Sequence, residues 1–482
     1  MFKKREKRDP YVWEAIISIL ALIVPISLAI VKYEADAQIP ILIGVLVAAL
    51  MGMRAGYEWK EIEGGMLDGI ANSLQAIVIL AIIGILIGVW ILSGVVPTLL
   101  YYGLKILHPK IFLPAAVIIC SIASLATGTS WGTTGTIGIA LIGIGAGLGF
   151  PLPVVAGAVL SGAYFGDKMS PLSDTTNLAP AMVGTDLYTH IKHMAYTTGV
   201  SYGLTLVIES VLSFIYGGGQ SDTASINQIL NGIDAQFSIN PLLLLPAVVI
   251  MFLAYRKIPA IPGIAMGILA AAVLGVIFQG NNFGDILSAS FAGYTSNSGV
   301  AAVDNLLTKG GFESMLYTIS IVLCAMMFGG IMERTNQLRV VVNTILKKAQ
   351  STGSLITAAV LTAIAANLIL CDQYMSIVMT GKMYAQSFQD RGLHPKNLSR
   401  VVEDSATVTA NLVPWNTGGA YQTATLGVPT IAYLPWNFFC WISPIVTMAY
   451  GWFGITIAPI DEEADQKPVT AEEHEQTASS GS

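Results

Sequence analysis

Two polar stretches, GDKMSPLSDTTN and VEDSATVTAN, interrupt long apolar runs and carry the side chains most able to do chemistry. Asp167 and Asp174 in the first stretch have the same spacing as Asp404 and Asn411 in the second. Carboxylate and hydroxyl oxygens suit a small, hard cation, and a carboxylate can carry a proton instead. The residues therefore predict a site at which a cation and a proton compete.

Two further polar breaks, TGTSWGTTGT at 127–136 and CDQYMS at 371–376, lie in apolar regions. Backbone polar groups released from a helix cannot face lipid, because each unsatisfied group costs several kcal/mol. Broken helices therefore survive in a membrane only where they line a cavity or are buried in protein. We expect all four breaks to meet in the middle of the protein.

The candidate ligands are the polar side chains of these four breaks. The uncharged candidates are Ser130, Thr133, Thr134, Ser170, Ser173, Thr175, Asn177, Thr407, Thr409 and Asn411. For any single hydroxyl, a bond between neighbouring helices is an equal alternative. Carboxylates are a sharper signal, because charge inside a membrane is expensive and normally functional; they are Asp167, Asp174, Asp372, Glu403 and Asp404.

The carboxylates suggest a mechanism. We expect Asp174 or Asp404 to lose its proton to the cytoplasm, take up the cation and be protonated again on the other side. Lys168 either neutralises a neighbouring aspartate or extends to the membrane surface.

The composition is that of a polytopic membrane protein. Of 482 residues, 54% are hydrophobic and 11% are charged, against about 25% charged in soluble proteins. Apolar runs near the length of about 20 residues that spans a bilayer occur at 11–31, 39–53, 74–96, 195–216, 240–255, 259–279, 312–332 and 430–453. The four cysteines lack metal-ligand spacing, so we expect no zinc site, disulfide framework or cofactor.

The segments that must position the breaks occur twice. IPILIGVLVAALMG from Ile39 resembles IPGIAMGILAAAVLG from Ile261, and GGM at 64 matches GGF at 310. Two pairs of breaks then follow in the same order. This pattern predicts two structural repeats.

Loop charge indicates that the repeats are inverted. The basic N-terminus should stay cytoplasmic, so the acidic loop VKYEADAQ lies outside, whereas its counterpart YRKIP is basic and belongs inside. Equivalent loops then fall on opposite faces. This charge pattern is satisfied if 111–149 and 354–388 are re-entrant hairpins, which leaves about ten membrane-spanning helices. Hydropathy alone leaves full crossings open as an alternative.

These arguments divide an all-α membrane protein with broken helices at the midplane into five parts. They are a basic cytoplasmic N-terminus (1–10), transmembrane repeat 1 (11–216), an extracellular linker (217–239), transmembrane repeat 2 (240–455) and an acidic, disordered cytoplasmic tail (456–482).

Four motifs carry a resemblance to a known family. ATGTSWGTTGT, GDKMSPLSDTTNLAP, CDQYMSIV and EDSATVTANLVPWNTGGAYQ resemble the NhaC family of sodium/proton antiporters in the ion transporter superfamily, and the likeness covers about residues 10–455. The resemblance implies alternating access in the cell membrane, with Na+ moving out as H+ enters. It leaves open whether the chain forms a homodimer.

The resemblance also assigns site residues. The polar motifs of the family fall on Thr129, Ser130, Trp131, Thr133, Thr134, Asp167, Ser170, Ser173, Asp174, Thr175, Asp372, Gln373, Asp404, Thr407, Asn411, Trp415 and Asn416. Asp167, Asp174, Asp372 and Asp404 are then the candidates for proton coupling, and Asp174 and Asp404 for Na+ binding.

Other functions are less well supported by the residues. The family includes exchangers of small carboxylates such as malate and lactate, but the breaks contain no arginine fork for an organic anion. An intramembrane aspartyl protease would not need the repeat, and AYFGD has Tyr164 where its motif requires glycine. No nucleotide-binding motif supports a primary pump, no signalling domain supports a sensor, and no nucleic-acid partner is expected.

Overall fold

A computed structural model describes residues 6–33, 35–217, 223–346 and 349–460 of the chain, and every named element in these ranges is a helix. Seven helical segments are long and apolar enough to cross a membrane: 12–30, 59–92, 109–127, 187–217, 260–279, 312–334 and 352–370. Two further segments, 226–255 and 430–453, are helix pairs bent by 95° and 57°. The predicted all-α polytopic fold is confirmed.

The helices of the first half precede the predicted linker. They are α1 (Val12–Lys32), α2 (Gln38–Arg54), α3 (Trp59–Leu92), α4 (Val95–Ile106), α5 (Phe112–Thr127), α6 (Ser130–Thr133), α7 (Ile139–Gly147), α8 (Leu152–Met169), α9 (Asp174–Val183) and α10 (Leu187–Gly217). The predicted linker contains a helix of its own, α11 (Thr223–Gln236).

The helices of the second half follow α11. They are α12 (Leu245–Tyr255), α13 (Ala260–Gln279), α16 (Phe312–Arg334), α17 (Gln337–Leu346), α18 (Thr352–Leu370), α19 (Gln373–Gln389), α20 (Pro395–Val402), α21 (Thr417–Leu426), α22 (Thr430–Tyr433) and α23 (Phe438–Phe453). Two short helices, α14 (Phe283–Ala292) and α15 (Ala301–Leu307), stand between α13 and α16.

Helix α3 begins at Trp59, earlier than the apolar run that predicted a span from 74. A capping interaction explains the difference, because the Glu61 carboxylate accepts a hydrogen bond of 3.0 Å from the backbone N–H of Glu58. Such a cap lets the helix continue through polar residues beyond its apolar part.

The two predicted hairpins turn with the same backbone geometry. Gly128 (φ +72°) directly follows α5, and Cys371 (φ +60°) directly follows α18. Both residues have the left-handed conformation that commonly closes a helix. The next residues, Thr129 and Asp372, are extended, and each side chain accepts a hydrogen bond from a backbone N–H three residues later. These matched turns support two structural repeats.

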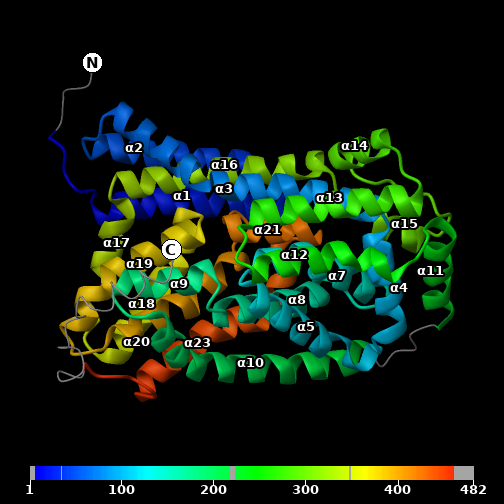
Figure 1. The fold of residues 1–482 in the computed structure, drawn as a ribbon. Coiled ribbons are helices and arrows are strands. Elements are labelled where there is room, and N and C mark those ends of the chain that lie inside the picture. The colour runs from blue at the N-terminus through cyan, green and yellow to red at the C-terminus, as the bar shows by residue number, and fades with distance from the viewer. Residues whose placement is uncertain (1–5, 34, 218–222, 347–348, 461–482) are drawn as a thin grey trace, which may run out of the picture.

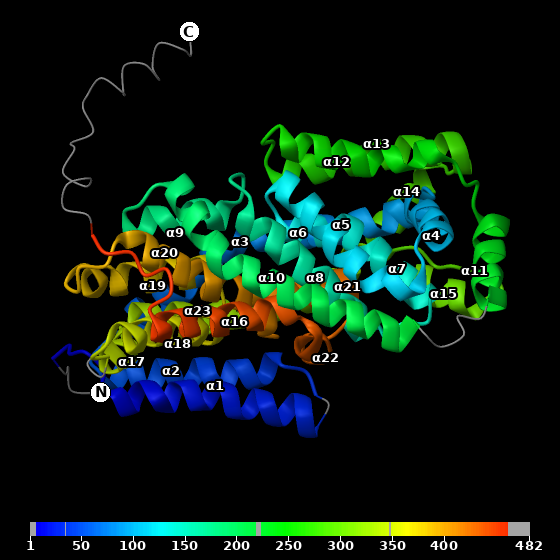
Figure 2. The same cartoon turned by 90° about the horizontal axis from the view of Figure 1, so that it is seen from below.

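The two limbs of each hairpin pack side by side and run antiparallel. The rings of Phe112 and Phe150, at the far ends of the first hairpin, lie 5.2 Å apart, and the hydroxyls of Thr362 and Tyr384 lie 2.7 Å apart in the second. Helices α5 and α7 extend toward one end of the molecule, and α18 and α19 toward the other (Figures 1 and 2). The hairpins therefore enter from opposite ends, as inverted repeats require.

The repeats pack together through α3 and α16. A Cβ atom at Gly69 would lie 2.2 Å from the Met326 carbonyl oxygen, and one at Gly330 would lie 2.0 Å from that of Gly65. Glycine at these positions lets the two backbones approach closely, a common basis of helix association in membranes. Helix α2 also packs on α16, and α13 packs on α3, so each half contacts the central helix of the other.

The described chain begins and ends at the same end of the molecule, opposite α11 (Figures 1 and 2). Residues 456–460, which we assigned to a disordered tail, pair with the segment after α19, where the Ile460 N–H donates to the Gly392 carbonyl at 2.9 Å. The remainder of the predicted tail, and the basic residues before Glu6, lie outside the described residues.

Candidate ion-binding site

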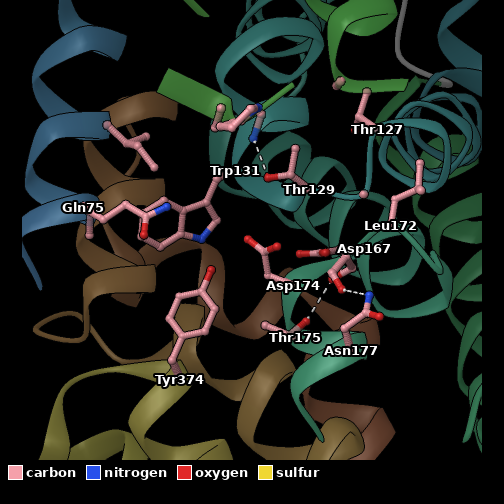
Figure 3. A pocket seen from close by; sticks show the side chains of 18 of the residues that line it. Gln75, Thr127, Thr129, Trp131, Asp167, Leu172, Asp174, Thr175, Asn177 and Tyr374 are labelled. Carbon is pink, nitrogen blue, oxygen red and sulfur yellow. Dashed lines mark hydrogen bonds between the residues drawn. The ribbon is translucent and has the colours of Figure 1, made fainter. Parts of the chain in front are cut away.

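A cavity of about 580 Å³ lies where the two hairpin tips meet (Figure 3). Its lining comes from the first tip (127–129), the second tip (372–374), the break between α8 and α9 (171–175), the α12–α13 turn (257–260) and α3. Tips that enter from opposite ends thus line one cavity, so neither hairpin crosses the whole molecule. Both hairpins thus turn at the cavity, as the hairpin interpretation predicts, and their first limbs, 109–127 and 352–370, are also long enough to span a membrane.

Asp167 joins α8 to the first hairpin. Its carboxylate accepts hydrogen bonds from the Ser130 backbone N–H at 3.0 Å and from the Ser130 hydroxyl at 2.6 Å. The side chain is 6% exposed, and it lines the cavity. Charge-assisted bonds of this kind hold the carboxylate in a fixed position.

Asp174 is the first residue of α9, directly after the helix-capping Ser173. Its side chain lies at the cavity beside Asp167, Trp131 and Tyr374 (Figure 3). Within the described part of the chain, no group donates a hydrogen bond to its carboxylate, and the N-terminus of a helix favours a negative charge there. Asp174 therefore has both carboxylate oxygens available to a cation.

Asp372, in contrast, is engaged by the protein. One oxygen accepts from the Met375 N–H at 3.0 Å, and the other accepts from the Thr417 hydroxyl at 3.1 Å. The Thr417 N–H also donates to the Cys371 carbonyl at 2.8 Å. Asp372 thus fixes the second hairpin tip against α21.

The cavity carries an excess of negative charge. Asp167, Asp174 and Asp372 line it, and Lys257 is the one cationic side chain among its described lining residues. A cleft lined by one sign of charge concentrates ions of the opposite sign. The cavity is therefore suited to a cation.

A buried ion pair lies behind the cavity and joins the two repeats. Lys168 pairs with Asp404, and both side chains are fully buried. The second Asp404 oxygen accepts from the Thr197 hydroxyl at 2.7 Å and from that of Thr447, while Lys168 also donates to the Ser443 hydroxyl at 3.0 Å. Additional hydrogen bonds of this kind are needed if a pair is to offset its loss of hydration.

The neighbour of Asp404 faces the cavity side. Glu403 and Asp404 begin η4 (Glu403–Thr407), a π-helical turn, a feature frequent at functional sites. Glu403 accepts from the hydroxyl of Thr175, a cavity residue, at 3.0 Å. Its other oxygen has no partner among the described residues. The turn therefore links the buried pair to the cavity.

Comparison with known proteins identifies the family of the chain. The sequence profile of the Na+/H+ antiporter family matches residues 11–163 and 162–455. The chain belongs to this family. As a member, it is a multi-pass membrane transporter rather than an enzyme, which agrees with its composition and helices.

Three relatives are similar over almost their full length. The chain is 38% identical to the malate-2H+/Na+-lactate antiporter of Bacillus subtilis, over 93% of this chain and 96% of that protein. It is 37% identical to the Na+/H+ antiporter NhaC of Alkalihalophilus pseudofirmus, over 94% and 97%. It is also 37% identical to the arginine/ornithine antiporter ArcD of Halobacterium salinarum, over 93% of each chain. The predicted resemblance to the NhaC family is confirmed.

In this antiporter, about half of the candidate residues line the cavity. They are Thr129, Trp131, Asp167, Ser173, Asp174, Thr175, Asp372 and Gln373, together with Asn177. The Trp131 ring also stacks on Tyr421 at 4.2 Å, so it braces the first hairpin as well as facing the cavity.

Other candidates support the backbone around the cavity. The hydroxyls of Thr133, Thr134, Ser170 and Thr409 donate to main-chain carbonyls. Trp415 donates to the Leu368 carbonyl at 2.9 Å and Asn416 to that of Asn367 at 3.0 Å, so both hold the second hairpin. These bonds match the alternative expected for single hydroxyls.

Three candidates lie in other surroundings. Asn411 accepts from the Asn437 amide at 2.6 Å, and Thr407 is buried without a partner among the described residues. Asp404 pairs with Lys168 and is absent from the cavity lining, so the structure does not bring it together with Asp174 at one site.

The sequence analysis missed several lining residues, among them Asn72, Gln75, Lys257 and Tyr374. Asn72 and Gln75 stand at the start of an apolar run, and polar side chains there were an available signal. The α12–α13 turn, which contains Lys257, gave no such signal in the sequence, because its composition is that of an ordinary basic loop.

Proposed function

We propose that this antiporter exchanges Na+ for H+ at the cavity, with Asp174 as the group for which the two ions compete. The observation that carries the proposal is a carboxylate at the cavity that no described donor engages, at the N-terminus of α9. Ionised Asp174 would bind Na+ with neighbouring oxygens, and protonated Asp174 would release it. Competition at one group couples the two movements.

The local chemistry supports a sodium site. The Ser173 and Thr175 hydroxyls lie 3.1 Å apart beside Asp174, and both residues line the cavity. Hydroxyl and carboxylate oxygens suit a hard cation. Inverted repeats provide two related arrangements of one central site, as alternating access requires.

A second function has one observation in its favour. A cavity of about 580 Å³ is far larger than a sodium ion and lies in the range of sites for small organic molecules. Because the Bacillus subtilis relative exchanges malate and lactate, a carboxylate substrate is the alternative, with Lys257 as its cationic partner. Three lining carboxylates would repel such an anion, so the charge of the cavity favours Na+.

Proteoliposomes that contain a trapped pH dye can distinguish these functions. We expect NaCl alone to drive proton movement in the direction opposite to Na+. Movement that begins only after malate or lactate is added would replace Na+/H+ exchange with carboxylate exchange.

We also propose that the protein spans the cell membrane with both ends in the cytoplasm. Lys7 and Arg8 stand directly before α1, and basic residues near a first span favour the cytoplasmic side. The described ends lie together, so the C-terminal end of the described chain shares that side (Figure 2).

A further inference from the structure

Helix α10 carries a polar stripe inside the protein. Thr197, Ser201, Thr205, Glu209 and Ser213 recur every four residues, and all five are fully buried. Residues at this spacing share one face of a helix. Polar groups are expensive in a membrane, so such a stripe needs an explanation. The four hydroxyls have one, because each donates to a main-chain carbonyl.

Glu209 is the residue of this stripe whose burial most needs an explanation. Its side chain is 0% exposed, and neither carboxylate oxygen has a hydrogen-bond partner among the described residues. An ionised carboxylate in apolar surroundings is very costly without a partner. The glutamate therefore holds a proton in this conformation, and a proton is a ligand that needs no cavity.

No described ionisable group nearby pairs with Glu209. Helix α10 packs against α5, α8, α9, α20, α23, η1 (Pro109–Ile111) and η4. The buried charged or acidic groups on these elements are Cys120, Tyr164, Asp167, Lys168, Arg400, Glu403, Asp404 and Cys440. None of them forms a hydrogen bond with the Glu209 carboxylate, so the glutamate is not half of a structural ion pair.

Glu209 stands on this stripe between the buried pair and one end of the molecule. Toward the pair, Thr205 and Ser201 lead to Thr197, whose hydroxyl donates to Asp404 at 2.7 Å. Toward the other end, the Ser213 hydroxyl donates to the Pro109 carbonyl at 2.9 Å, where η1 opens the first hairpin. Successive groups are about 6 Å apart along the helix axis.

We propose that Glu209 is a proton-binding site on a route along α10, from the end of the molecule that contains η1 to Asp404. The inference rests on the proposed Na+/H+ exchange. The Glu209 carboxyl releases its proton toward Asp404 through the stripe hydroxyls, with a water molecule in each gap, and is reprotonated from the aqueous phase at the η1 end. A proton on Asp404 weakens its attraction to Lys168. The change reaches the cavity through the neighbouring Glu403, which accepts from the hydroxyl of Thr175 beside Asp174.

Glu209→Gln tests this site, because glutamine has the same size but cannot exchange a proton. The variant and the wild-type full chain are compared in proteoliposomes in two modes, Na+/H+ exchange and the exchange of radioactive for unlabelled Na+. We expect Na+/H+ exchange to fall by at least about tenfold while Na+/Na+ exchange is retained, since the latter transfers no net proton.

Three further variants complete the experiment. Glu209→Asp keeps the carboxyl group and should recover part of the Na+/H+ exchange. Glu313→Gln removes an exposed carboxylate from α16 and should change neither mode. If Glu209→Gln does not fold, Ser201→Ala tests the same route and should show the same selective loss.

The outcomes separate this inference from the proposed function. If the wild-type protein moves no protons with Na+, the proposed function fails, and the inference fails with it. If the wild type exchanges Na+ for H+ and Glu209→Gln does so equally fast, the inference alone is wrong. A parallel loss of both modes would assign Glu209 a structural role and would also overturn it.

Discussion

At the scale of single residues, neighbouring side chains serve different regions of the protein. Asp167 binds Ser130 at the cavity, whereas Lys168 reaches the buried Asp404. Successive side chains on a helix point in different directions, so one helix end can supply a residue to the cavity and the next residue to the buried ion pair. The Lys168–Asp404 pair joins residues from the two halves, 236 positions apart. That separation explains why the sequence left the role of Lys168 undecided.

The first prediction concerns this pair. Lys168→Met leaves the buried Asp404 carboxylate without its cation, so we expect the free energy of unfolding to fall by about 3–5 kcal/mol. Denaturant unfolding of the purified variant in detergent measures the change. The double variant Lys168→Met/Asp404→Asn should recover a large part of the loss.

The matched control for this prediction is Lys192→Met, which removes an exposed lysine from α10. It should leave the stability unchanged within about 0.5 kcal/mol. If Lys168→Met were as stable as this control, the pair would contribute nothing to the fold.

At the scale of elements, the hairpin tips and the helix breaks form the site. Their positions could be predicted because Gly, Pro, Ser and Thr concentrate at 127–136 and 166–177 within apolar runs. Their depth could not be predicted, because hydropathy reports the length of an apolar run and not where the chain turns. The left-handed residues Gly128 and Cys371 fix that turn, and a cysteine gives little sign of it.

The second prediction concerns the first tip. A Cβ at Gly128 would lie 2.7 Å from the backbone carbonyl carbon of Leu172 in the α8–α9 break, and the φ angle is +72°. Gly128→Ala should therefore destabilise the protein and move the tip away from the cavity. Gly149 has a similar angle, but a Cβ there would meet no described atom within 4 Å.

Gly149→Ala thus isolates backbone strain, which costs about 1–2 kcal/mol. Thermal unfolding and Na+/H+ exchange, measured on both variants, should show a larger loss for Gly128→Ala in each assay. Equal losses would mean that the contact with Leu172 does not position the tip.

At the scale of the whole molecule, two inverted repeats place their hairpins tip to tip. The sequence predicted this topology from loop charge and from motifs that occur in the same order in each half. It did not predict the shared lining by α3 and the α12–α13 turn, because contacts between distant helices leave no periodic signal. Asn72 and Lys257 are the clearest examples.

The third prediction tests the topology. Ser238 follows α11, whereas Asp390 follows α19, and the two lie in loops at opposite ends of the molecule (Figure 1). In a cysteine-free background, Ser238→Cys should react with a membrane-impermeant thiol reagent in intact cells. Asp390→Cys should react only after permeabilisation, and reaction of both in intact cells would contradict the inverted arrangement.

The central claim is that Na+ and H+ compete for Asp174, and Na+/H+ exchange by Asp174→Asn in proteoliposomes tests it most directly. The control is Asp186→Asn, which removes an exposed carboxylate from the loop before α10. We predict that Asp174→Asn folds normally but moves no protons when NaCl is added, while Asp186→Asn matches the wild type. Wild-type exchange by Asp174→Asn would contradict the claim.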